Sequence, residues 1–100
     1  MIHVVAIITA KPGQRSAVLE AFAENRPTVL AEDGCIEYGA AVDLESMGTA
    51  AYGPDAFVVI EKWESEDALK AHAAAPHMKA YGEKNKDLVA SRVIHVLKPV

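Results

Sequence analysis

The sequence predicts a single α+β domain whose strands and helices follow the order βαββαβ. The chain has 100 residues, which is within the usual range of one domain. Hydrophobic residues make up 51% and charged residues 24%, a composition that favours a packed globule over disorder. Short strand-like segments alternate with stretches in which apolar residues recur at helical spacing. We therefore expect residues 1–100 to form one domain.

The first strand is predicted over Ile2–Ala10, which is rich in β-branched residues and apolar on both faces. A turn at residues 11–13 precedes a helix that extends to about Ala31. Pro27 falls inside this helix and has no backbone N–H group, so we expect it to kink or split the helix. Arg26 is expected near the inward stripe of the same helix.

The second strand is predicted from Cys35 to about Leu44 and the third over Ala56–Glu64. A ten-residue loop from Glu45 to Pro54, rich in glycine and small residues, joins them. One face of the second strand is expected to carry Ile36, Tyr38, Ala40, Val42 and Leu44. One face of the third is expected to carry Phe57, Val59, Glu61 and Trp63.

A second helix is predicted to begin after Ser65, whose side chain can cap it, and to extend to about Ala75 before Pro76. Acidic residues occupy its first turn, where the helix dipole favours negative charge. The helical spacing places His72 on the inward stripe.

A further helix from His77 to about Ala90, with Tyr81 turned toward the core, and a fourth strand over Arg92–Leu97 complete the order. This order is that of the split βαβ, ferredoxin-like arrangement, in which helices cover one face of a four-stranded antiparallel sheet. The first and fourth predicted strands are apolar on both faces. A second layer must therefore cover the sheet face that the helices leave open. We expect a second copy of the chain to supply it, giving a homodimer in the form of a dimeric α+β barrel.

Charge and hydropathy exclude several classes of protein. The net charge is −4 and the ten Lys and Arg residues are scattered, which argues against a nucleic-acid-binding protein. No strongly basic amphipathic helix or membrane-spanning stretch is present, and the first residues lack the basic start of a signal peptide. Cys35 is the single cysteine and cannot form an internal disulfide. We expect a cytoplasmic protein without a membrane or nucleic-acid partner.

Four short motifs occur in a characteristic order along the chain. They are G-x-x-x-Y from Gly34 to Tyr38, Pro54-Asp55-Ala56-Phe57, the segment from Glu61 to His72, and Pro76-His77-Met78. Together they resemble the antibiotic-biosynthesis monooxygenase family. The resemblance implies a dimeric ferredoxin-like barrel with a ligand cavity between sheet and helices in each subunit. It also implies oxygenation of a quinol, anthrone or similar phenol by dioxygen, with no metal or flavin cofactor.

Under this resemblance, His72 is the candidate catalytic base, because an imidazole ordinarily titrates near neutral pH and this one is expected to face inward. Trp63 is the candidate aromatic wall of the site, and Glu61 is the candidate partner that orients the imidazole. The candidates for contact with the substrate are Tyr38, Phe57, Tyr81 and Arg26.

Each of these residues has a structural alternative. His72 can hydrogen-bond a backbone carbonyl, Trp63 can serve core packing and Glu61 can form a salt bridge, all without chemistry. We predict no metal site, because Pro76 separates His72 from His77 and their spacing differs from that of paired ligands on one helix.

Two other functions stay open at this point. One is a non-catalytic dimeric barrel that binds a small hydrophobic metabolite, and the other is an isomerase or dehydratase-like activity that uses the same histidine. Haem degradation is disfavoured, since the first strand lacks the asparagine typical of haem-degrading members.

Overall fold

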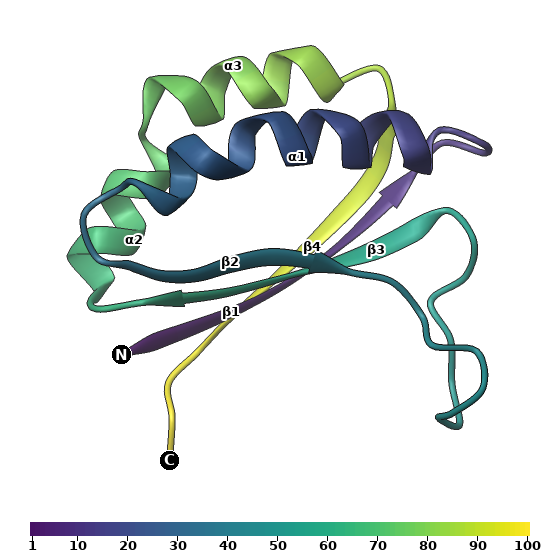
Figure 1. The fold of residues 1–100 in the computed structure, drawn as a ribbon, viewed down its shortest axis with the longest axis horizontal. Coiled ribbons are helices and arrows are strands. Elements are labelled where there is room, and N and C mark those ends of the chain that lie inside the picture. The colour runs from purple at the N-terminus through teal and green to yellow at the C-terminus, as the bar shows by residue number, and fades with distance from the viewer.

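The computed structural model describes residues 1–100 as one sheet covered on one face by helices (Figure 1). In chain order the elements are β1 (Ile2–Ala10), α1 (Arg15–Leu30), β2 (Cys35–Ala41), β3 (Ala56–Trp63), α2 (Glu66–Ala73), α3 (Pro76–Asn85) and β4 (Val89–Leu97). The four strands pair in the order β2-β3-β1-β4, and each neighbouring pair is antiparallel. The predicted fold class is therefore confirmed.

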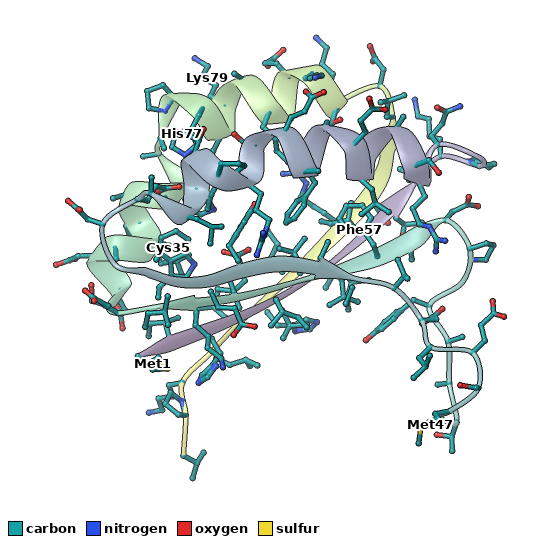
Figure 2. All side chains as sticks on the ribbon, viewed as in Figure 1. Met1, Cys35, Met47, Phe57, His77 and Lys79 are labelled. Atoms are coloured by element: carbon teal, nitrogen blue, oxygen red, sulfur yellow. The ribbon has the colours of Figure 1, made fainter.

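The core lies between the sheet and the helices. In β3, burial alternates as the sequence predicts, because Phe57, Val59, Glu61 and Trp63 face the helices. Trp63 and Phe57 are among the largest fully buried side chains. Figure 2 shows the Phe57 side chain in the layer between α1 and the sheet. This face of β3 therefore anchors the domain and presents one carboxylate, Glu61, to the interior.

The predicted face of β2 is wrong at Ile36. Cys35 pairs with Trp63 and Glu37 with Lys62, so Ile36 is an extra residue in a β-bulge. The bulge turns Ile36 outward, where 46% of it is exposed, and keeps Tyr38 on the buried side. The strand also ends at Ala41 instead of near Leu44. Val42 and Leu44 are consequently exposed at the start of the loop.

Pro27 does not split α1, which is continuous over Arg15–Leu30. The proline removes only the hydrogen bond to the carbonyl of Ala23, and it stands near the end of the helix. Its own carbonyl still accepts a bond from the Ala31 N–H at 3.2 Å. The last turn therefore forms despite the missing donor.

The boundary between α3 and β4 also differs from the prediction. The helix ends at Asn85, short of Ala90, and the strand begins at Val89, ahead of Arg92. Pairing of Val89 with Ala10 of β1 extends the sheet into residues that helical spacing alone assigns to the helix. Packing in the folded chain outweighs local propensity here.

The sheet face away from the helices carries apolar side chains that are exposed to solvent. Ile60 of β3 and Val93 and Leu97 of β4 are each at least 40% exposed. The loop that contains Met47 also projects on this side of the sheet (Figures 1 and 2). None of the three helices has the length and apolar character needed to cross a membrane.

Candidate active site

The cavity between the helices and the sheet, called here the helix–sheet cavity, has a volume of about 520 Å³. Hydrophobic residues make up 12 of the 18 that line it. The titratable groups on its wall include four residues that the sequence indicates: Tyr38, Glu61, His72 and Tyr81. An apolar cavity with a few convergent polar groups is the usual form of a small-molecule site.

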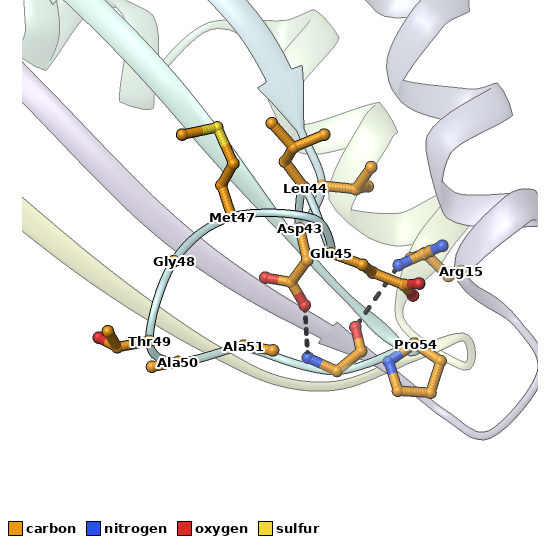
Figure 3. Close-up of a pocket in the computed structure, with 12 residues that line it drawn as sticks. Arg15, Asp43, Leu44, Glu45, Met47, Gly48, Thr49, Ala50, Ala51 and Pro54 are labelled. Atoms are coloured by element: carbon orange, nitrogen blue, oxygen red, sulfur yellow. Dashed lines mark hydrogen bonds between the residues drawn. The ribbon is translucent and has the colours of Figure 1, made fainter.

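A larger hollow of about 900 Å³ lies within the loop over residues 42–54 (Figure 3). Two of its polar side chains, Asp43 and Arg15, already bond to the loop itself. The Asp43 carboxylate accepts hydrogen bonds from two backbone N–H groups of the loop at 3.0 and 2.9 Å, and these hold its pKa below the usual range. Arg15 donates to the carbonyl of Gly53 at 3.5 Å. Because these groups shape the loop, we assign the candidate site to the smaller helix–sheet cavity.

His72 is held by the short helix α2. The Ser65 hydroxyl caps this helix by accepting a hydrogen bond from the Ala68 N–H at 3.1 Å. His72 is the buried residue of the helix, with 5% exposure, and it lies on the cavity wall. The prediction that His72 faces inward is therefore confirmed.

Each ring nitrogen of His72 has an acidic neighbour. Nδ1 lies 2.8 Å from Glu32 Oε2, whereas Nε2 lies 3.9 Å from Glu61 Oε1. A carboxylate can only accept a hydrogen bond. When the imidazole is neutral, its proton therefore lies on Nδ1, which donates it to the hydrogen bond with Glu32. Nε2 is then the nitrogen that is free to accept a proton.

Glu32 is the residue of the candidate site that sequence reasoning missed. It follows α1, 40 residues before His72, and its side chain is only 13% exposed. The same Oε2 atom bonds to Nε2 of His77 at 2.9 Å. His77 follows Pro76 at a helix start, where exposure is the default, yet 26% exposure and this bond make it part of the cluster.

Gly34 allows Glu32 to reach α2. Its φ angle is +82°, and a Cβ atom placed on it would lie only 2.6 Å from Cβ of Ala68. The Gly34 carbonyl also accepts a bond from the Glu64 N–H at 2.8 Å. Only glycine fits this close approach without strain. The glycine that begins the G-x-x-x-Y motif was thus the one sequence signal for a contact between this turn and α2.

Glu32, His72 and His77 together offer a donor set for a divalent cation. One ligand atom from each lies within 4.8 Å of the others. Sequence spacing argues against this grouping, but the turn between α2 and α3 brings both histidines to one carboxylate. Two imidazoles and a carboxylate are a common set for transition metals.

Glu61, Trp63 and His72 form the contact group that the sequence places together. Trp63 Nε1 donates a hydrogen bond to Glu61 Oε1 at 2.9 Å. The Trp63 ring also packs against the imidazole, with ring centroids 4.5 Å apart. Burial raises the pKa of the Glu61 carboxyl, while the Trp63 bond and the neighbouring His72 oppose that rise. Trp63 itself lies behind the wall and braces the imidazole.

The two candidate tyrosines both line the cavity. Tyr38 stacks on Phe22 with ring centroids 5.0 Å apart and meets the His72 ring edge-on at 5.6 Å. Burial raises the pKa values of the Tyr38 and Tyr81 phenols. Both therefore stay protonated at neutral pH and can donate a hydrogen bond.

Phe57 and Arg26 lie outside the cavity wall. Phe57 is 1% exposed and packs behind Phe22 in the core. Arg26 is exposed, and its Nε atom donates to the carbonyl of Tyr38 at 2.7 Å. Its contact ties α1 to β2 and so supports the position of Tyr38.

Comparisons with known proteins bear on the family and the fold of the chain. The model of the family described as antibiotic biosynthesis monooxygenase matches residues 1–84. The probable quinol monooxygenase YgiN of Escherichia coli (strain K12) is 45% identical over 102 aligned positions, which cover 99% of this chain and 98% of that protein. The crystal structure of PA3566 from Pseudomonas aeruginosa superposes with a TM-score of 0.84 at 25% identity, covering 99% of this chain and 93% of that one. A conserved protein from Methanosarcina mazei Go1 shares the fold, with a TM-score of 0.85 at 24% identity and coverage of 99% and 92%.

Proposed function

The chain belongs to the antibiotic biosynthesis monooxygenase family, and on that premise we propose that it oxygenates a quinol, anthrone or similar phenolic aromatic molecule with dioxygen. The observation that carries the proposal is a buried histidine, His72, on the wall of a largely apolar cavity, with one ring nitrogen bonded to Glu32. The name of the 45% identical relative, a probable quinol monooxygenase, favours a quinol.

The first chemical step is removal of a proton from the substrate. Nε2 of His72 accepts the proton of a phenolic hydroxyl, and Glu32 stabilises the imidazolium through Nδ1. The resulting anion is more electron-rich than the phenol and can itself give an electron to dioxygen. The apolar lining lowers the amount of water around this anion and holds the ring in place.

The electrons balance without a further reductant. A quinol with a free ring C–H supplies four electrons, two as it becomes a quinone and two as the C–H becomes C–OH. Dioxygen accepts all four, so one oxygen atom enters the product and the other leaves as water. An anthrone does the same when its CH₂ group becomes C=O. This balance supports a reaction with no resident cofactor.

Other wall residues bind and orient the substrate. The neutral phenols of Tyr38 and Tyr81 donate hydrogen bonds to substrate oxygen atoms. Glu61 lies on the Nε2 side of the imidazole and limits how the ring can turn. Trp63 fixes the plane of the same ring through its packing contact.

We further propose that the working form is a homodimer. The open sheet face carries exposed Ile60, Val93 and Leu97, and burying such side chains is favourable. A second copy packed face to face covers both sheets at once with the same surface. The helix–sheet cavity lies on the opposite face, so each subunit keeps its own site.

The direct test is isotopic. We expect metal-free protein, incubated with ¹⁸O₂ and a menadiol-like quinol or an anthrone, to give a product with one labelled oxygen atom and labelled water. Unlabelled quinone with release of hydrogen peroxide would instead indicate simple oxidation and contradict the proposal. Binding of these aromatics without turnover would favour the non-catalytic barrel, and turnover without oxygen would favour an isomerase or dehydratase-like activity.

A further inference from the structure

We propose that Glu32, His72 and His77 form a binding site for a divalent transition-metal ion and that the bound ion switches off His72 as a base. Binding of the ion is independent of the proposed function, whereas the loss of the base rests on it. The ion is an inhibitor in this proposal and takes no part in oxygenation. Three separate segments supply the ligands: the turn after α1, the helix α2 and the start of α3.

The three ligand atoms lie close enough to share one ion. Glu32 Oε2 lies 2.8 Å from Nδ1 of His72 and 2.9 Å from Nε2 of His77. All three atoms lie within 4.8 Å of one another. In a four-coordinate zinc site, neighbouring ligand atoms are roughly 3.3 Å apart. A zinc ion therefore fits once each nitrogen moves away from the carboxylate oxygen by about half an ångström.

The charge around His72 favours a cation. Glu32 and Glu61 flank its two ring nitrogens, and the side chains of both glutamates are at most 13% exposed. The lysine ion pairs of the chain involve other glutamates, and no lysine or arginine forms a salt bridge with these two. Part-buried carboxylates are costly without a positive partner. A divalent ion supplies that charge.

The cluster is open to solvent on the side of His77. This residue lies at the start of α3 (Figure 2), and its side chain is 26% exposed. An ion can therefore enter there and meet the Glu32 carboxylate, which His77 contacts directly. Two imidazole nitrogens and one carboxylate oxygen favour Zn²⁺, Co²⁺ or Ni²⁺ over Mg²⁺ and Ca²⁺, which prefer oxygen ligands.

A metal ion at Nδ1 reverses the proton arrangement of His72. In the metal-free protein Nδ1 carries the proton and donates it to Glu32, so Nε2 is the acceptor. A metal ion occupies the lone pair of Nδ1, and the single proton of the neutral ring must then lie on Nε2. Glu61 Oε1 lies 3.9 Å from Nε2, and a carboxylate is a usual partner for the N–H group of a metal-bound histidine. In this form Nε2 can no longer accept a proton from the substrate.

Calorimetric titration of metal-free protein with zinc tests the site itself, with magnesium as the comparison ion. We expect one zinc ion per chain and an affinity at least about tenfold lower in His77→Gln, because an amide is a poorer zinc ligand than an imidazole. His95→Gln is the matched control, since His95 lies next to Val5 on the open sheet face. His77→Ala is measured in parallel, with circular dichroism, in case the glutamine variant does not fold.

Equal zinc affinity in the His77 variants and in His95→Gln would overturn the inference. Equal affinity of the wild type for zinc and magnesium would overturn it as well, because imidazole ligands discriminate against magnesium.

The switch is read from the ¹⁵N chemical shifts of the His72 imidazole and from oxygen uptake. We expect the proton on Nδ1 in metal-free protein and on Nε2 with one equivalent of zinc. We expect the same zinc to suppress uptake by the wild type and by His95→Gln more strongly than uptake by His77→Gln, each relative to its own metal-free rate. Zinc-bound protein that keeps the proton on Nδ1, or that keeps its full uptake rate, would overturn the switch.

Failure of this inference and failure of the proposed function are distinguishable. If zinc binds and moves the proton but ¹⁸O₂ gives no labelled product in the metal-free protein, the proposed function fails and the metal site stands. If labelling is found and zinc does not bind, only the metal site fails.

Discussion

Oε2 of Glu32 lies 2.8 Å from Nδ1 of His72 and joins the turn after α1 to the centre of α2. This contact holds the imidazole in the form whose Nε2 can accept a proton. Glu32 is thus a positioning residue, comparable in geometry to the carboxylate that orients the histidine of a serine-protease triad.

Replacing the carboxylate by its amide tests that role. We expect Glu32→Gln to lower kcat for oxygen uptake at least about tenfold with a smaller change in KM, because the amide stabilises the imidazolium poorly. The matched control is Glu37→Gln, an exposed glutamate on β2 that pairs with Lys62 at 3.1 Å. A Glu32→Gln variant with the kcat of the control would remove Glu32 from the mechanism.

Gly34→Ala tests the turn that brings Glu32 to α2. An alanine there adopts a φ of +82° and its Cβ meets Cβ of Ala68 at 2.6 Å. We expect a loss of about 2 kcal/mol or more in the free energy of unfolding, measured by urea denaturation. Gly82→Ala is the control, since nothing lies within 4 Å of the added atom and alanine favours a helix. Equal stability of the two variants would show that the turn does not need glycine.

Glu61 predicts a pH dependence of stability. Because burial raises the pKa of this carboxyl in the folded protein, the folded state binds its proton more tightly than the unfolded state. The stability due to the protonated carboxyl is present below the unfolded pKa, near 4.5, and is lost as pH rises through the folded value. Glu61→Gln keeps an acceptor for Trp63 but has no such proton to lose. We therefore expect the Tm of Glu61→Gln to rise relative to the Tm of the wild type as the pH increases above about 4.5.

A constant difference in Tm across that range would mean that the Glu61 pKa is not raised. Glu37→Gln again serves as the control, because its carboxylate is exposed at the sheet edge and we expect no comparable trend.

The open sheet face predicts dimerisation. Ile60 is 40% exposed on this face, and we expect Ile60→Lys to shift the protein from dimer to monomer in sedimentation experiments at micromolar concentration. Leu30→Lys is a matched control, because Leu30 is 39% exposed but lies on the helical side of the molecule. A wild type that sediments as a monomer would contradict the proposed dimer.

The sequence predicts the fold and the buried face of β3 because both follow from local periodicity. Alternating apolar residues place Glu61 and Trp63 on one face, and helical spacing places His72 inward, so these three are found together. The bulge at Ile36 escapes this reasoning, since an extra residue breaks the period of two without leaving a mark in composition.

Contacts between distant turns could not be predicted in the same way. Glu32 is an ordinary polar residue at a helix end, and none of its neighbours in the sequence indicates a bond to His72 or His77. Asn85 is likewise polar in a polar stretch, and only the packing of α3 in the folded chain, where it contacts α1, reveals that it is buried. The polar cluster can therefore be found only from the tertiary structure, whereas the buried apolar residues can be predicted from the sequence pattern.

Oxygen uptake by chelator-treated protein with a menadiol-like quinol, compared between the wild type and His72→Ala, is the first test of His72 as the catalytic base. His95→Ala is the histidine control, because His95 lies on β4 next to Val5, on the open face. We expect uptake above the autoxidation rate in the wild type and in the control, and a rate near background in a folded His72→Ala variant. Uptake that persists in His72→Ala, or that needs an added divalent cation in the wild type, would contradict the role of His72 as the base.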